Sequence, residues 1–381
     1  MSRLIQGRMV AIFLCLLTLL LCGCGSKAKD LWRKRVILDE EPFPANKAGR
    51  CIGLSSDGKL LISEGGHLIL QDLSTGAQIP LIVGDTLTEE MLRAKLMAQQ
   101  DGRVTLDDVS EENLADACLP IASVSPNSCA GWLILDTRTD VFLLDTASGK
   151  LYGHPEARYI AACGNDLMFY RYKESCVHIY NRESGQTYVE DFSADFPAGD
   201  SSVCSAAFLA DGSIAVIVRV QNRSELVIRS AQDEDERISL GRYNYFGWES
   251  IHSLGSRYLV IDDIVGMASP SLLVDRNSKD VSALVINRGM LQVLPQNDWA
   301  SVDLDGILRD MESHVYWVQS LMDGKTMLLA GWGSRLLMFN PEQQETQIVQ
   351  SDESGLYHAM SDGHERLFVG IGERLYRLRA E

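Results

Sequence analysis

Short apolar runs separated by tight turns recur from residue 50 to the C-terminus, and this repetition constrains the fold more than any other feature of the chain. Two of the units end in closely related turns, Asp72-Leu-Ser-Thr-Gly76 and Asp145-Thr-Ala-Ser-Gly149. Runs of this length between such turns predict strands of an antiparallel meander. A unit of three or four strands cannot bury both its faces alone, so the repeated units are predicted to stack against one another.

The sequence therefore predicts an all-β fold, a β-propeller of seven blades with three to four antiparallel strands each, over residues 31–381. Six or eight blades remain open, because an extra segment separates the fifth and sixth units. The last unit is one strand short. We expect the segment 33–39, with Val36-Ile-Leu38 at its centre, to supply that strand and close the ring. The units that end in Asp72–Gly76 and Asp145–Gly149 resemble the WD40-like and quinoprotein-like propeller superfamily.

Two insertions, 84–117 and 287–313, interrupt the repeats. In the first, Thr86 and Glu89 form a capping box, which predicts a helix over residues 86–100, and residues 110–117 suit a second short helix. We thus expect a small helical insertion between blades 1 and 2. The segment 287–313 is predicted to be irregular. Because insertions carry function more often than strands do, both are candidates for partner recognition.

The N-terminus has the three-part plan of a secretory signal, with Arg3 and Arg8 followed by an apolar run over residues 9–21. The run ends in Leu21-Cys22-Gly23-Cys24, which resembles the lipobox of bacterial lipoproteins. The resemblance implies that residues 1–23 are a signal peptide, that Cys24 is lipidated, and that residues 24–30 form the lipidated N-terminus and tether. An uncleaved anchor, or an ordinary signal with an incidental cysteine, is the alternative.

This N-terminus predicts a location in the bacterial cell envelope, on the periplasm-facing or extracellular side of a membrane. The expected partners are the membrane, reached through the lipid anchor, and an unidentified envelope protein. The formal net charge of −17 argues against nucleic acid, since an acidic surface repels phosphates. Six of the nine cysteines would remain after processing and lipidation, and disulfides and free thiols suit them equally.

Residues 301–312 resemble a calcium-binding loop. Oxygen donors stand at positions one, three, five and twelve, and a glycine stands at position six. The candidate ligands for calcium, the one cofactor considered, are Ser301, Asp303, Asp305 and Glu312. The alternative interpretation is an Asp-Gly turn that leads into a short acidic helix.

No catalytic residue is predicted, because the sequence contains no Gly-x-Ser-x-Gly, His-Glu-x-x-His or phosphate-binding loop. The first hypothesis is therefore a lipid-anchored, non-enzymatic propeller that acts as a protein-interaction or assembly scaffold. The alternative is a propeller enzyme, a hydrolase or quinone-dependent dehydrogenase, or a protein that binds calcium or a small ligand in the central channel.

Overall fold

The computed structural model describes part of the chain. The described residues are 36–38, 50–55, 57–64, 67–83, 123–124, 131–136, 141–153, 157–171, 175–181, 183–193, 201–209, 211–220, 223–230, 235–241, 249–263, 269–287, 290–310, 313–320, 325–331, 335–349, 357–361, 367–371 and 374–380. The predicted signal peptide, Cys24, the tether and the helices predicted within 84–117 lie outside these ranges. None of the described helices is both long enough and apolar enough to cross a membrane.

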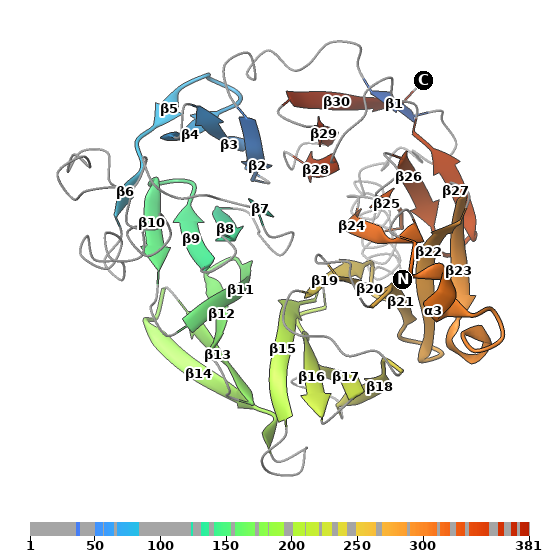
Figure 1. Cartoon of the computed structure of the whole chain (residues 1–381). Helices are drawn as coiled ribbons and strands as arrows, with labels where there is room; N and C mark the ends of the chain where they lie inside the picture. The colour runs from blue at the N-terminus through green and yellow to red at the C-terminus, as the bar shows by residue number, and fades with distance from the viewer. Residues whose placement is uncertain are drawn as a thin grey trace, which may run out of the picture.

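The described strands form seven sheets arranged in a ring around a central axis (Figure 1). The first sheet contains β2 (Arg50–Leu54), β3 (Lys59–Glu64), β4 (His67–Asp72) and β5 (Gln78–Ile79). The second contains β6 (Ile82–Val83), β7 (Ser123–Val124), β8 (Trp132–Asp136), β9 (Val141–Asp145) and β10 (Lys150–Gly153). The third contains β11 (Ala157–Cys163), β12 (Asp166–Arg171), β13 (Cys176–Asn181) and β14 (Gln186–Asp191).

The other four sheets continue around the ring. The fourth contains β15 (Ser201–Phe208), β16 (Ile214–Val220), β17 (Arg223–Arg229) and β18 (Glu236–Ser239). The fifth contains β19 (Glu249–Leu254), β20 (Tyr258–Asp263), β21 (Ser271–Asp275), β22 (Asp280–Asn287) and β23 (Met290–Pro295). The sixth contains β24 (Val315–Ser320), β25 (Met327–Gly331), β26 (Arg335–Asn340) and β27 (Glu345–Ile348). The seventh contains β28 (Tyr357–Ser361), β29 (Leu367–Ile371), β30 (Arg374–Ala380) and β1 (Val36–Leu38).

Counted outward from the axis, the first strands of the seven sheets are β2, β7, β11, β15, β19, β24 and β28 (Figure 1). Successive strands of each sheet pair antiparallel, except β6, which pairs in parallel with β10. First strands of adjacent sheets contact one another, as β11 does with β15 and β2 with β28. The all-β propeller prediction is therefore confirmed. Two sheets exceed the expected three to four strands, because β6 adds to the second in parallel with β10 and β23 adds to the fifth antiparallel to β22.

The ring closes through the two ends of the propeller. Strand β1 pairs antiparallel with β30, with Val36 opposite Ala380 and Leu38 opposite Leu378. The prediction that the segment around Val36-Ile-Leu38 completes the last unit is confirmed. The seventh sheet thus joins the first described strand to the last three, which removes two open sheet edges.

The core is divided into layers between neighbouring sheets. On β16, Ala215 and Ile217 pack toward the fifth sheet, whereas Val216 and Val218 pack toward the third. All four side chains are buried. Central strands covered on both faces explain why the sequence shows continuous apolar runs instead of alternation.

The segment 287–313 is more ordered than predicted. It contains β23, the 3₁₀ helix η6 (Gln296–Asp298) and the four-residue helix α3 (Leu304–Ile307). Trp299 follows η6 and is buried in the layer between the fourth and fifth sheets, with its Nε1 donating to the Leu294 carbonyl at 2.9 Å. A Cβ on Gly241, at the end of the fourth sheet, would lie 2.6 Å from the Trp299 ring. The apolar content of this segment therefore packs it against two blades.

Candidate functional site

The turns between the third and fourth strands of five sheets share one hydrogen-bonding pattern. Each begins at an Asp or Asn whose side-chain oxygen accepts a backbone N–H two or three residues later. These residues are Asp72, Asp145, Asn181, Asp275 and Asn340. We call the five turns together the turn face. Asx turns of this kind fix the backbone of a short loop.

The fifth residue of every turn on the turn face has a positive φ. The angles are 73° at Gly76, 71° at Gly149, 67° at Gly185, 61° at Lys279 and 54° at Gln344. Glycine adopts this conformation at little cost, which explains the Ser/Thr-Gly signal in the sequence. Lys279 and Gln344 adopt the same conformation without being glycine, so the geometry repeats where the sequence signal does not.

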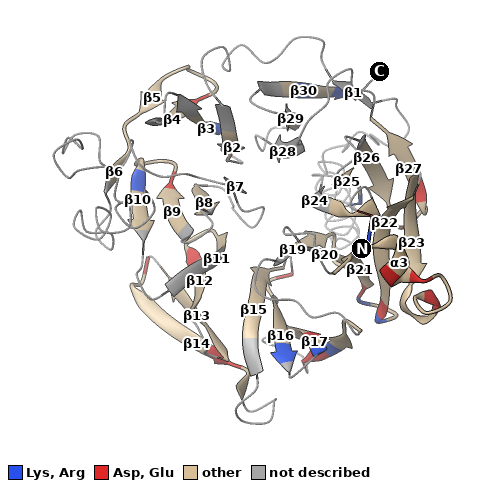
Figure 2. Ribbon diagram, viewed as in Figure 1, with Lys and Arg blue, Asp and Glu red and all other residues tan. Residues whose placement is uncertain are grey.

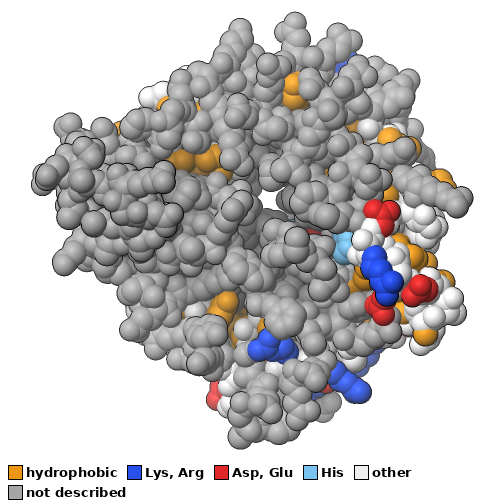
Figure 3. All heavy atoms as spheres, in the orientation of Figure 1, with side chains coloured by type: hydrophobic (Ala, Val, Ile, Leu, Met, Phe, Trp, Pro, Cys, Tyr) orange, Lys and Arg blue, Asp and Glu red, His pale blue; other side chains and the backbone are white. Residues whose placement is uncertain are grey.

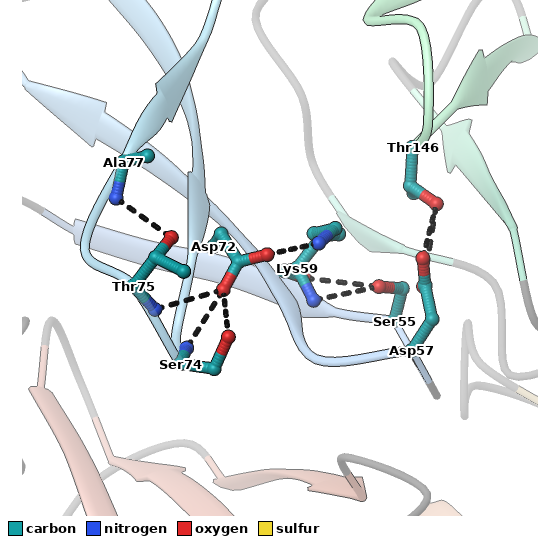
Figure 4. Close-up of polar contacts among 8 residues, drawn as sticks. All are labelled: Ser55, Asp57, Lys59, Asp72, Ser74, Thr75, Ala77 and Thr146. Atoms are coloured by element: carbon teal, nitrogen blue, oxygen red, sulfur yellow. Dashed lines mark hydrogen bonds and ion pairs between the residues drawn. The ribbon is translucent and has the colours of Figure 1, made fainter.

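Figure 4 shows how the turn of the first sheet is held. The Asp72 carboxylate accepts the backbone N–H groups of Ser74 at 2.8 Å and Thr75 at 3.0 Å. The Lys59 ammonium, at the start of β3, pairs with the same carboxylate. The lysine is the main reason that the pKa of Asp72 lies far below its usual range. The turn is thus tied both to itself and to the neighbouring strand.

A second set of bonds joins adjacent sheets at the same end. Thr146, directly after Asp145 in the second sheet, donates its hydroxyl to Asp57 in the first sheet at 3.0 Å (Figure 4). Arg276, directly after Asp275 in the fifth sheet, pairs with Asp211 in the fourth at 2.7 Å. Asp57 and Asp211 both lie between the first two strands of their sheets. The same topological contact therefore links two pairs of blades.

Arg276 also forms a second ion pair with the fourth sheet. Its second amino group pairs with Glu236 at 2.8 Å, so one guanidinium binds two carboxylates of the neighbouring sheet. Partial burial tends to raise the pKa of Asp211, but hydrogen bonds from Ser213 and Arg276 outweigh it and lower that pKa to about 2. Asp211 therefore remains ionised at neutral pH.

The tips of the turn face are exposed. Ala147, Asn277 and Gln343 are exposed, and only their backbone N–H groups take part in the turn bonds described above. The turns thus present side chains to solvent from a backbone that is held by hydrogen bonds within each sheet. At two places, contacts between neighbouring sheets hold it as well. Such preorganised loops lose little conformational entropy when another molecule binds them.

The calcium candidates take other roles in the described residues. Ser301 donates to the Asp298 carbonyl at 2.8 Å, and Asp303 accepts the Gly306 N–H at 3.3 Å as the N-cap of α3. Asp305 lies within α3. Figure 2 shows acidic residues along the ribbon at α3, and in the same region the space-filling view of Figure 3 shows acidic and basic side chains side by side. This geometry is closer to the alternative interpretation, a turn into a short acidic helix.

Gly306 differs from the expected loop as well. It lies inside α3, and a Cβ there would collide with the Asp303 carboxylate, so the glycine serves the cap. Glu312 lies outside the described residues. In the part of the chain that is described, no group of three His, Cys, Asp or Glu side chains is placed to hold a metal ion. Calcium binding at this segment stays a prediction.

A buried polar group between the fifth and sixth sheets was not predicted. Ser271 Oγ lies 3.1 Å from Asp262 and 2.9 Å from the Val315 carbonyl oxygen of β24. Nearby on β19, His252 is buried, and within the described residues its Nε2 has no hydrogen-bond partner. Burial lowers the pKa of His252 to about 4. No sequence motif identifies these residues, because each belongs to an ordinary apolar strand.

Comparison with solved structures finds three chains whose backbones align with most of this one. The RRP9 WD40 repeats align with 91% of this chain and 98% of their own, at 9% identity and a TM-score of 0.48. The Cps50 (Swd1) β-propeller domain of Myceliophteria thermophila aligns over 90% and 98%, at 10% identity and a TM-score of 0.47. The extracellular domain of the putative hybrid two-component system BT3049 of B. thetaiotaomicron aligns over 90% and 42%, at 11% identity and 0.46.

No family model matches the sequence, and neither does any curated protein. The class of protein is defined by the chain's own sheets: it is an all-β propeller whose described strands form seven blades. In five of these blades, Asp and Asn side chains fix the backbone of the turn between the third and fourth strands.

Proposed function

We propose that this chain is a lipid-anchored, non-enzymatic propeller of the bacterial cell envelope that acts as a protein-interaction or assembly scaffold. The observation that carries the proposal is the turn face, where exposed side chains stand on preorganised turns. Binding to a preformed surface avoids the entropic cost of ordering loops. The lipobox-like sequence before Cys24 supports the anchor, and the formal charge of −17 favours a partner with a basic surface.

The anchor is tested on the full chain expressed in bacteria with an alkyne-labelled fatty acid. We expect the wild-type protein to carry the label and to sediment with membranes. Cys24→Ser should lose the label, and Cys22→Ser should keep it as the matched control. A wild-type chain without acyl groups at Cys24 would refute the lipid anchor.

The scaffold role is tested by placing a photoreactive amino acid at Ala147, Asn277 or Gln343 in the full chain. These side chains are exposed and do not hold the turns. Illumination of intact cells should give a discrete adduct with the same envelope protein from at least two of these positions. Met290, which is 64% exposed on β23, is the control position outside the turn face and should give none. Adducts from Met290 alone would contradict the proposal.

A further inference from the structure

The outer strand of the third sheet, β14 (Gln186–Asp191), has an edge with which no other described strand pairs. It is the last strand of its sheet, and five of its six residues are exposed. Tyr188 is 45% exposed and Val189 is 51% exposed. In Figure 2 β14 is mostly uncharged, with acidic residues at one end. An exposed strand of this length is a template for pairing with another strand.

The pairing of β14 with β13 shows which of its backbone groups are free. Phe192 donates its N–H to the Ser175 carbonyl at 3.0 Å, so this pair is hydrogen-bonded across the two strands. Because hydrogen-bonded pairs alternate in an antiparallel ladder, Gln186, Tyr188 and Glu190 also bond β13. Thr187 and Val189 therefore direct their N–H and C=O groups away from the sheet, where the described residues provide no partner.

Several of the usual protections of an outer strand are missing in β14. Proteins blunt such edges with short strands, proline or lysine. The outer strands β5, β18 and β27 contain two, four and four residues, and β23 ends in Pro295. The six residues Gln-Thr-Tyr-Val-Glu-Asp of β14 contain neither proline nor lysine.

The acidic end of β14 is already compensated by the fourth sheet. Arg229 pairs with Glu190 at 3.2 Å and donates to the Asp191 carbonyl at 3.0 Å. The guanidinium offsets the local negative charge and occupies the carbonyl oxygen of Asp191. The open edge is thereby limited to Thr187 and Val189.

We propose that β14 pairs antiparallel with β14 of a second copy of this chain about a two-fold axis. Residues whose backbone N–H and C=O groups point away from the sheet must pair with one another across the new edge. The register therefore places Thr187 opposite Val189, and Tyr188 opposite its own copy. Gln186 then faces Glu190, and no two acidic residues are directly opposed. An isologous contact of this kind closes at two copies.

The two neighbouring registers, with Thr187 or Val189 opposite its own copy, are less favourable, because each separates the two copies of Tyr188. A shift that sets Val189 opposite itself would place Thr187 opposite Asp191, whose carbonyl already accepts from Arg229. It would also place Tyr188 opposite Glu190, and so separate the two aromatic rings. Cross-strand aromatic pairs stabilise a sheet, and the proposed register forms one at the axis.

The net charge sets how this dimer depends on salt. Each copy carries a formal charge of −17, so the two copies repel one another at low ionic strength. Salt screens that repulsion, whereas main-chain hydrogen bonds and the tyrosine contact are affected little. Dimerisation is therefore expected to strengthen as salt is added.

The register is tested by disulfide trapping in the full chain, purified in mild detergent, with the exposed Cys163 replaced by serine as the background. Directly opposed residues that do not bond across the new edge lie about 4.5 Å apart at Cα, within disulfide reach. Tyr188→Cys should thus form a disulfide with its own copy. Gln186→Cys is the matched control, because Gln186 faces Glu190 in this register. Its own copy lies four residues further along the partner strand, beyond disulfide reach. We expect at least about a tenfold excess of dimer for Tyr188→Cys.

A second variant tests the open edge itself. Val189→Pro removes an outward N–H and leaves the ladder to β13 intact, whereas Val189→Thr keeps that N–H and the β-branched shape. With circular dichroism confirming the fold, light scattering should show dimerisation weakened about tenfold or more for proline and unchanged or nearly so for threonine. A wild-type chain monomeric at every salt concentration, a dimer that survives Val189→Pro, or equal trapping at positions 186 and 188 would each overturn the proposal. Pairing of β14 with another protein's strand in place of its own copy would overturn it as well.

Discussion

Thr146 in the second sheet donates its hydroxyl to both carboxylate oxygens of Asp57 in the first sheet, at 3.0 and 3.2 Å. The two residues are far apart in the sequence and belong to different turns. Thr146 is fully buried, and its backbone N–H is held by the Gly131 carbonyl at 3.0 Å. The side chain can therefore reach Asp57 only when the first two blades are correctly docked.

Thr146→Val tests the energetic value of this contact. Valine keeps the shape and the backbone bond but removes the donor, which leaves a half-buried carboxylate without its partner in the neighbouring blade. We expect the free energy of unfolding to fall by about 1 kcal/mol, measured with guanidinium chloride at neutral pH. Thr75→Val is the control, because Thr75 is exposed and its Oγ accepts only within its own turn. Equal effects of the two substitutions would contradict an inter-blade role.

Lys279→Gly should stabilise the protein. Lys279 is exposed and holds a φ of 61°, a conformation that costs a non-glycine residue about 1 kcal/mol. Glycine removes that strain but loses more entropy on folding, so the expected net gain is roughly 0.5 kcal/mol. Unfolding in guanidinium chloride measures it, and Lys279→Ala, which keeps the strain, is the control.

Gly149→Ala should have the opposite effect. Gly149 has a φ of 71°, and a Cβ there would collide with the Pro80 carbonyl oxygen. Backbone strain and steric overlap add, so we expect a loss well above 1 kcal/mol in the same measurement. A neutral substitution would show that the second sheet can shift away from residue 80.

The repeating strands could be predicted because each carries its own local signal. Apolar runs between Asp-Gly and Ser-Gly turns define one strand at a time, and the missing strand of the last unit led to Val36-Ile-Leu38. Strand β23 was missed because the residues that follow β22 were treated as the start of an irregular segment. Gly289 is the residue type that short hairpin loops prefer, and this signal could have identified the strand.

The contacts between blades could not be predicted from local patterns. Asp211 and Arg276 meet only because consecutive sheets stack with a particular rotation. Trp299 lies in a segment that was predicted to be irregular, yet it is buried against Gly241. The spacing of Asp303 and Asp305 predicts calcium ligands, and that prediction stays untested. The spacing alone did not predict that the carboxylate of Asp303 caps a four-residue helix.

Asp211→Asn should reduce the loss of stability in acid. The folded pKa of Asp211 is about 2, below the usual value of 3.8, so its ionised form stabilises the fold above the unfolded pKa. That contribution is lost as pH falls from about 4 through 2. Urea unfolding across this range should show a shallower pH dependence for Asp211→Asn than for wild type. Asp211→Glu, which keeps an ionisable carboxylate at this position, is the control and should retain most of the wild-type pH dependence.

His252→Leu should remove part of the loss of stability between neutral and mildly acidic pH. His252 is buried on β19, and its pKa falls from 6.5 to about 4 through burial. Between these values the unfolded chain binds a proton that the folded chain does not, so stability falls as pH decreases from about 6.5 to 4. The free energy of unfolding, measured in urea from pH 7.5 to 4, should decline less steeply in the variant. His252→Gln keeps a polar group but cannot titrate, so it separates the effect of the proton from the effect of packing. Its free energy of unfolding should depend on pH as that of His252→Leu does, even if its stability at pH 7.5 is lower. Slopes equal to wild type in both variants would mean that His252 is protonated in the folded protein.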